Sequence, residues 1–175
     1  MSSLPIPHRK AAAPGGVRYL GAIIGIGYGI ARLLDEQHFT FTTTDIVAAL
    51  SGMMVVAGFL GAVSIGCMNQ IFSTLSDGLF SDYLKEEGVF DQFLAWPQII
   101  LLIQMSYLVL CAAGVLFVCT TSQNFGRTIV LCELSTLTLY LTTKTWSLLD
   151  LLRILAWHRQ DYARILREEI SLAKQ

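Results

Sequence analysis

Two uncharged apolar runs constrain the fold of this chain more than any other feature. Residues 46–68, IVAALSGMMVVAGFLGAVSIGCM, and residues 98–119, QIILLIQMSYLVLCAAGVLFVC, contain no Asp, Glu, Lys or Arg. At a rise of about 1.5 Å per residue, a helix of either length crosses a hydrocarbon core of about 30 Å. Only 14% of the 175 residues are charged, against roughly a quarter in soluble domains. Both runs therefore predict transmembrane helices.

Two further segments predict membrane helices of a less apolar kind. Residues 17–34 have an uncharged centre with an arginine near each end, and such arginines can extend to opposite interfaces. The other segment begins near Thr128 and carries Glu133 and Lys144. We therefore expect an all-α, polytopic membrane protein with four transmembrane helices in residues 17–150 and amphipathic cytoplasmic helices.

The distribution of Lys and Arg predicts the orientation. With four spans, ten of these twelve residues fall on one side of the membrane and only Arg32 and Arg127 on the other. Such an excess marks the cytoplasmic side. We expect both termini in the cytoplasm, in a bacterial inner membrane. Residues 1–16 would form a flexible arm, residues 69–96 a cytoplasmic loop, and residues 151–175 an amphipathic cytoplasmic helix.

Small residues recur every fourth position on the first two predicted helices. They are Gly21, Gly25 and Gly29 on the first helix, and Gly58, Ala62 and Gly66 on the second. Small side chains let helix backbones approach closely in lipid, where no hydrophobic force drives association. These faces are expected to pack against each other within one chain or, alternatively, against the same faces of another copy.

A line of polar residues, here called the polar seam, follows one face of the fourth predicted span at alternating steps of three and four. Its members are Glu133, Thr136, Tyr140, Thr143, Ser147 and Asp150. A carboxylate inside a span is costly and is expected to face protein or water. Three interpretations stay open: interhelical packing, with Gln104 and Ser106 as candidate neighbours; a cation-attracting lumen in a homo-oligomer; or an ion relay.

The predicted cytoplasmic loop is acidic, whereas the C-terminal helix is basic. The loop has five acidic residues and one lysine, and the helix has five basic and three acidic residues. An acidic helix is poorly suited to an anionic membrane surface, so we expect the loop to pack on the C-terminal helix. Alternatively, this helix docks a soluble protein or lies on the membrane. The candidate docking residues are Asp82, Glu86, Glu87, Arg159, Arg164 and Arg167.

No sequence pattern predicts an enzyme. A phosphate-binding loop, a metal motif and an activated nucleophile are all missing, and the four cysteines form no CxxC pair. We expect no catalytic residue, no cofactor, no metal ion and no nucleic-acid partner. The segment RILAWH contains Arg153 and His158 separated by four residues, a spacing that resembles the catalytic pair of HEPN ribonucleases. That resemblance implies a nuclease, with the histidine beside the scissile phosphate.

Two classes of function remain. The first is a homo-oligomeric channel, pore-like effector or membrane sensor. The second is a membrane anchor or scaffold subunit that docks a soluble cytoplasmic protein. The profile of a small polytopic chain with a helical cytoplasmic face resembles membrane components of bacterial anti-phage defence systems, without a family motif behind it. An auxiliary subunit of a respiratory or transport complex has the same profile.

Overall fold

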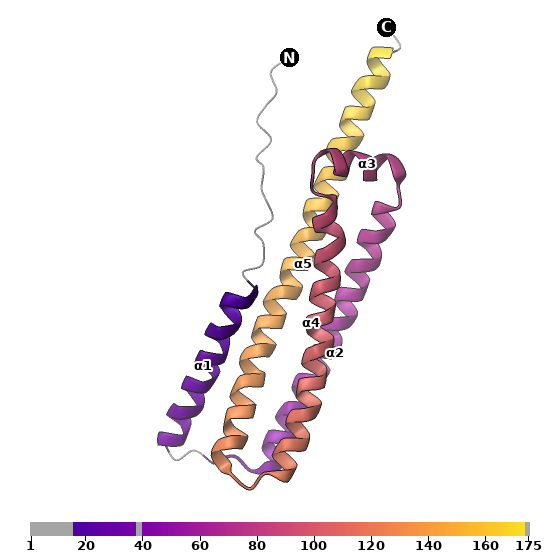
Figure 1. Ribbon diagram of the computed structural model, residues 1–175. Coiled ribbons are helices and arrows are strands. Elements are labelled where there is room, and N and C mark those ends of the chain that lie inside the picture. Colours follow the sequence, from indigo (N-terminus) through magenta and orange to yellow (C-terminus); the bar gives the residue numbers. More distant parts are fainter. Residues whose placement is uncertain (1–15, 38–39, 174–175) are drawn as a thin grey trace.

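The computed structural model describes residues 16–37 and 40–173, and within these ranges every regular element is a helix. The all-α prediction is therefore confirmed. The predicted N-terminal arm lies outside the described residues, except for Gly16. The elements are α1 (Gly16–Glu36), α2 (Thr43–Leu75), α3 (Gly78–Glu86), α4 (Phe90–Thr120) and α5 (Asn124–Ala173) (Figure 1).

The three long helices α2, α4 and α5 form a bundle, and α1 lies along the opposite side of α5 (Figure 1). Among the described residues, α1 contacts α5 and no other helix. The short α3 connects α2 to α4 at one end of the bundle, and α5 extends well beyond it (Figure 1). Helices α1 and α4 run in one direction, and α2 and α5 run in the other.

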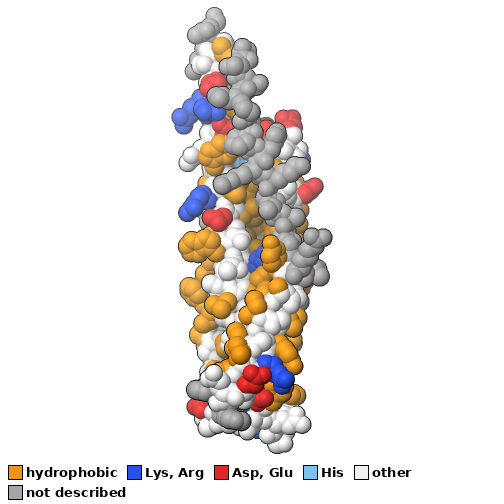
Figure 2. Space-filling view, turned by 90° about the vertical axis from the view of Figure 1, so that its left-hand side faces the viewer, with side chains coloured by type: hydrophobic (Ala, Val, Ile, Leu, Met, Phe, Trp, Pro, Cys, Tyr) orange, Lys and Arg blue, Asp and Glu red, His pale blue; other side chains and the backbone are white. Residues whose placement is uncertain are grey.

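Helices α2 and α4 are long and apolar enough to cross a membrane. Only 22% of the most apolar stretch of α2 and 28% of that of α4 is buried in the chain. The core helix of a soluble protein would be mostly buried, so this pattern favours lipid around them. Figure 2 shows hydrophobic side chains along the molecule and charged ones mainly toward its two ends. Two of the four predicted spans have this support; the other two remain predictions.

The bundle core follows one face of α5. Leu134, Leu141, Leu148 and Leu155 recur every seventh residue and are all buried against α2 and α4. A spacing of seven keeps side chains on nearly the same side of a helix. This stripe aligns α5 with both neighbouring helices along most of the bundle.

The connection between α2 and α4 is shorter than the predicted loop, because both helices extend past their apolar runs. Helix α2 continues to Leu75, and α4 begins at Phe90 rather than near Pro97. Pro97 is buried inside α4, seven residues after the helix begins. Asp77 and the positive φ of Gly88 bound α3, which leaves a compact helical connection in place of most of the predicted loop over residues 69–96.

The expected packing of the first helix on the second is wrong within one chain. A Cβ atom added at Gly21, Gly25, Gly29, Gly58 or Gly66 would meet nothing within 4 Å, and Ala62 is exposed. Instead, α1 turns Gly27 and Ala31 toward α5, and both are buried. Glu133 of α5 lies opposite Gly27, which gives a physical reason for this choice of face. Packing of the small-residue faces between copies stays a prediction.

Candidate functional site

The end of the polar seam nearest the start of α5, here called its outer part, is covered by α1. Glu133 and Thr136 are half-buried, and a Cβ atom at Gly27 would lie 2.9 Å from Glu133 Oε2 and 3.0 Å from Thr136 Oγ1. The missing side chain at Gly27 leaves room for the carboxyl group. The Thr136 hydroxyl donates within its own helix, to the Cys132 and Glu133 carbonyl oxygens at 3.1 and 2.9 Å. Glu133 therefore faces another helix of the same chain.

The opposite end of the seam, here called its inner part, is largely uncovered. Lys144 Nζ lies 5.1 Å from the ring centroid of Tyr140. Thr143 and Ser147 are exposed, and their hydroxyls donate to carbonyl oxygens one turn earlier at 2.7 and 3.0 Å. Asp150 is half-buried and pairs with Arg153 at 3.5 Å. Local bonds satisfy these hydroxyls, so their polarity does not require a neighbouring helix or a lumen.

A different polar cluster joins the three bundle helices. The Gln104 Nε2 amide of α4 donates to Ser64 Oγ of α2 and to Thr145 Oγ1 of α5, each at 2.8 Å. All three side chains are buried. Gln104 was expected to contact the polar seam. Its hydrogen-bond partner on α5 is instead Thr145, which is not a seam residue. Ser106, the other expected neighbour, is exposed and donates to the Leu102 carbonyl oxygen.

Thr145→Val is expected to lower the free energy of unfolding by about 1 kcal/mol, because the Gln104 amide loses an acceptor in the bundle core. Thr142→Val is the matched control, since Thr142 is exposed and its hydroxyl donates only to the Thr138 carbonyl oxygen. Denaturation in detergent would measure both. A double-mutant cycle of Thr145→Val with Gln104→Leu that shows no coupling would contradict the assignment.

At the end of the bundle where α3 lies, side chains of α3, α4 and α5 meet in a cluster of rings, here called the aromatic joint. It consists of Phe80, Tyr83, Phe93, Trp157, His158 and Tyr162. The Tyr162 ring centroid lies 5.7 Å from that of Phe80 and 5.4 Å from that of Tyr83. These contacts place the acidic connection against the C-terminal part of α5, as the sequence suggested.

Ring packing rather than charge makes that contact. Asp82 pairs with Lys85 in its own helix at 2.8 Å, and Arg164 pairs with Asp161 in its own helix at 2.6 Å. Among the described residues, no ion pair joins α3 to α5. The other candidate docking residues are three exposed ones and one that is half-buried: Glu86, Arg159, Arg167 and, half-buried, Glu87. Complementary net charge therefore acts only at longer range here.

Two groups of the joint have shifted pKa values. Burial lowers the pKa of His158, and the negative charges of Glu87 and Asp161 oppose this effect. The pKa of the Tyr83 phenol is raised by burial, with smaller contributions of the same sign from those two carboxylates. Both shifts favour the neutral forms, which suits a contact made of packed rings.

Beyond the joint, α5 continues past α3, and no other helix of the described residues lies beside it (Figure 1). Four of its apolar side chains are 38–68% exposed, and we call them the distal face: Ile165, Leu166, Ile170 and Leu172. Leu155, His158, Tyr162 and Ile165 follow one another at steps of three and four, so the distal face continues the stripe that packs inside the bundle. An apolar surface of this kind is typical of an interaction site.

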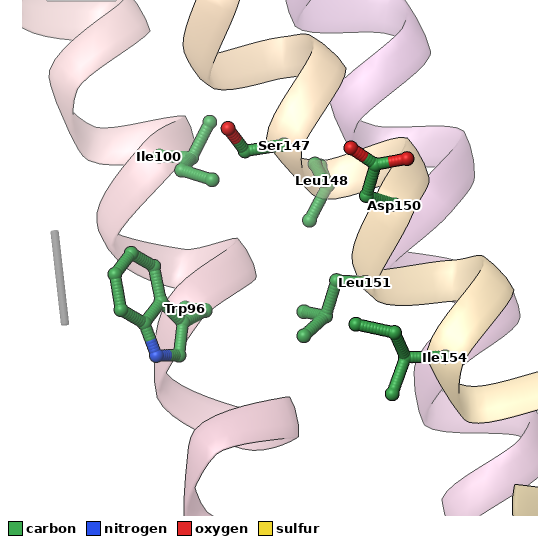
Figure 3. A pocket seen from close by; sticks show the side chains of 7 residues that line it. All are labelled: Trp96, Ile100, Ser147, Leu148, Asp150, Leu151 and Ile154. Atoms are coloured by element: carbon green, nitrogen blue, oxygen red, sulfur yellow. The ribbon is translucent and has the colours of Figure 1, made fainter. Parts of the chain in front are cut away.

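A shallow groove of about 170 Å³ opens between α4 and α5 (Figure 3). Figure 3 shows Trp96 and Ile100 of α4 facing Leu148 and Leu151 of α5. The full lining consists of Trp96, Ile100, Ser147, Leu148, Asp150, Leu151 and Ile154. Ser147 and Asp150 bring the inner end of the polar seam to the groove, whose walls are otherwise apolar.

Arg153 and His158 do not form a site together. The Arg153 side chain is 84% exposed and pairs with Asp150, whereas His158 lies inside the aromatic joint. Five residues on a helix of 3.6 residues per turn place two side chains about 140° apart. The two side chains that RILAWH suggested as a nuclease-like pair therefore do not meet within one chain.

No cluster of three or more His, Cys, Asp or Glu residues that could hold a metal ion occurs in the described part of the chain. The four cysteines are free thiols, and three of them are buried. No protein family model, curated protein or solved structure matches this chain. Its function is therefore inferred from the geometry of the polar seam, the aromatic joint and the distal face.

Proposed function

We propose that this protein is an integral membrane anchor that presents the cytoplasmic end of α5 to a soluble protein partner. The single observation that carries the proposal is the distal face, an exposed apolar surface on a helix that extends beyond its own bundle. Helix α5 has 50 residues and is about 75 Å long, more than twice the hydrocarbon thickness of a bilayer.

In this proposal, α1 and the first half of α5 cross the membrane together with α2 and α4. Helix α1 has 21 residues, about 31 Å, and lies alongside the bundle (Figure 1). Its outward side chains include Ile24, Ile26 and Ile30, which are all exposed and suit lipid. Trp96 and Trp146 would mark the inner interface, where indole rings are enriched. Both ends of the described chain would then face the cytoplasm of a bacterium.

The chemistry of the distal face indicates how a partner binds. Leu166 and Ile170 lie one turn apart, as in amphipathic helices that insert their apolar side into a groove. Arg159 and Arg167 are exposed on the same stretch of helix. The partner expected from these features has an apolar groove edged by acidic side chains.

The combination Leu166→Glu with Ile170→Glu is expected to reduce partner recovery at least about tenfold, because it places two charges on the apolar face. The matched control is Gln160→Glu with Ser171→Glu, which adds the same charges to the polar side of α5. Both variants and the native chain would be purified from host membranes and the associated soluble proteins quantified. Equal recovery with both variants would refute the anchor proposal, and membrane insertion should not change.

A second function, a homo-oligomeric conduit, is favoured by the uncovered inner seam. Thr143 and Ser147 are exposed and Asp150 is half-exposed, while the small-residue faces of α1 and α2 remain free to meet other copies. A conduit would pass ions in liposomes, and Asp150→Asn would change its cation selectivity. The anchor proposal gives no conductance in that assay.

A further inference from the structure

His158 occupies an environment that suits a neutral imidazole and not a charged one. Its ring lies 6.5 Å from Tyr83 of α3, 6.2 Å from Phe93 of α4 and 5.3 Å from Trp157 of α5, measured between centroids. The Nδ1 atom is buried and has no hydrogen-bond partner among the described residues. A proton added at Nδ1 would create a buried N–H group without an acceptor, which is unfavourable.

The charged groups around the ring come from two elements. Glu87 follows the last residue of α3, and Asp161 lies on α5, where it pairs with Arg164. Helix α4 contributes Phe93, which has no charge. The two carboxylates act on His158 at a distance, because neither forms an ion pair with it. The two carboxylates can attract a protonated His158 ring out of the joint. They do not supply a hydrogen-bond acceptor for Nδ1 while the ring stays in the joint.

We propose that the aromatic joint is a proton-sensitive hinge, in which neutral His158 holds α3 on α5 and protonated His158 releases it. Release would uncover Tyr162, which lies one turn before Leu166 on the same side of α5. The distal face would then grow toward the membrane by at least one turn. The hinge is a property of the chain itself, and only this consequence for docking rests on the proposed anchor function.

The direction of the pH dependence follows from the environment of His158. Burial lowers the pKa of His158 in the docked joint below the ordinary value of about 6.5, which applies when the ring is released into water. The docked state therefore binds fewer protons than the released state at mildly acidic pH. Docking is fully favoured above about pH 6.5 and weakens as the pH falls from there toward the lowered value. Full protonation weakens docking about tenfold for each unit of difference.

Hydrogen exchange of the α3 amides in the purified full chain tests release. Between about pH 7.5 and about pH 5.5, which bracket the ordinary pKa of histidine, exchange corrected for its intrinsic pH dependence should accelerate several-fold. Trp157 fluorescence, in a chain carrying Trp96→Phe and Trp146→Phe, reports protonation of the adjacent imidazole. Both signals should change over the same pH range. Exchange that stays constant while His158 titrates would overturn the hinge.

Three variants separate the hinge from other causes. His158→Gln keeps a polar side chain that cannot be charged, and it should remove the pH step. Glu87→Gln removes a carboxylate that favours the charged ring, so the step should move to lower pH. His38→Gln is the control and should leave the step unchanged. A step that persists in His158→Gln, or that fails to move in Glu87→Gln, contradicts the proposal.

The outcome is independent of the anchor function. The measurements need no partner, and the chain carrying Leu166→Glu and Ile170→Glu should keep the native pH step. A missing step together with partner loss in that variant would refute the hinge and leave the anchor standing. A normal pH step together with unchanged partner recovery would refute the anchor and leave the hinge standing.

Discussion

Gly27→Leu is expected to detach α1 from α5, whereas Gly25→Leu is expected to leave the two helices packed. A Cβ atom at position 27 would lie 2.9 Å from the Glu133 carboxyl group and 3.0 Å from Thr136 Oγ1, and a leucine adds three more carbon atoms. At Gly25, a Cβ atom would meet nothing within 4 Å. Helix α1 has no other helix to hold it among the described residues, so loss of this contact affects the whole element.

Overpacking costs about 1–3 kcal/mol, which weakens docking of α1 by roughly fivefold to 150-fold. The contact between Tyr28 and Phe125, whose ring centroids are 6.5 Å apart, offers a readout. A Tyr28→Cys, Phe125→Cys pair would be cross-linked by a short reagent in membranes. Cys119, the exposed native cysteine, would be replaced by serine.

Cross-linking should fall in the Gly27→Leu chain and remain native in the Gly25→Leu chain. Equal losses would show that both faces of α1 contact protein, as packing of copies through the small-residue stripe would require. A loss confined to Gly25→Leu would reverse the assignment of the buried face.

The sequence predicted the two apolar helices, because their formation follows from the length and composition of each segment. Residues 46–68 and 98–119 lie inside α2 and α4 as predicted, since in lipid a helix satisfies all backbone hydrogen bonds of a single segment. Their ends were less predictable. The extensions to Leu75 and from Phe90 pack against α3 and α5, and the uncharged runs alone do not mark where they end.

The prediction of which face of α1 packs against another helix was wrong. Glycine occurs at residues 21, 25, 27 and 29, so two faces of α1 offered small residues to a neighbour. The deciding factor lies about a hundred residues away, in a carboxyl group that needs cover at Glu133. Gly27 lies outside the regular four-residue repeat, and only its position opposite Glu133 distinguishes it from the other glycines of α1.

The polar contacts show the same limitation. The spacing of the polar seam correctly places its members along one side of α5, but helical spacing does not reveal which side faces a neighbour. Thr145 stands within the same stretch as Thr143 and Ser147, and only the structure distinguishes the buried hydroxyl from the exposed ones. Similarly, charge composition suggested that the cytoplasmic loop contacts the C-terminal helix, whereas the rings of Tyr83 and Tyr162 form the contact.

Gly114→Leu is expected to separate α4 from α5 and to lower the free energy of unfolding by about 2–3 kcal/mol. A Cβ atom at Gly114 would lie 2.9 Å from Leu134 Cδ1 and 3.1 Å from Val130 Cγ1, both on α5. The glycine therefore sets the distance between these helices. Ala113→Leu is the matched control, because Ala113 is exposed at the preceding position of the same helix. This substitution should change the free energy of unfolding by less than about 0.5 kcal/mol.

Denaturation of the purified chain in detergent, monitored through the loss of helicity, would give the free energy of unfolding of both variants. A compensating change makes the test specific: Leu134→Ala removes the side chain that a new residue at Gly114 would meet first, and should restore part of the stability lost in Gly114→Leu. Leu134 is itself buried, so Leu134→Ala alone should be destabilising. Additive losses in the double variant would contradict a close approach of α4 and α5 at this glycine.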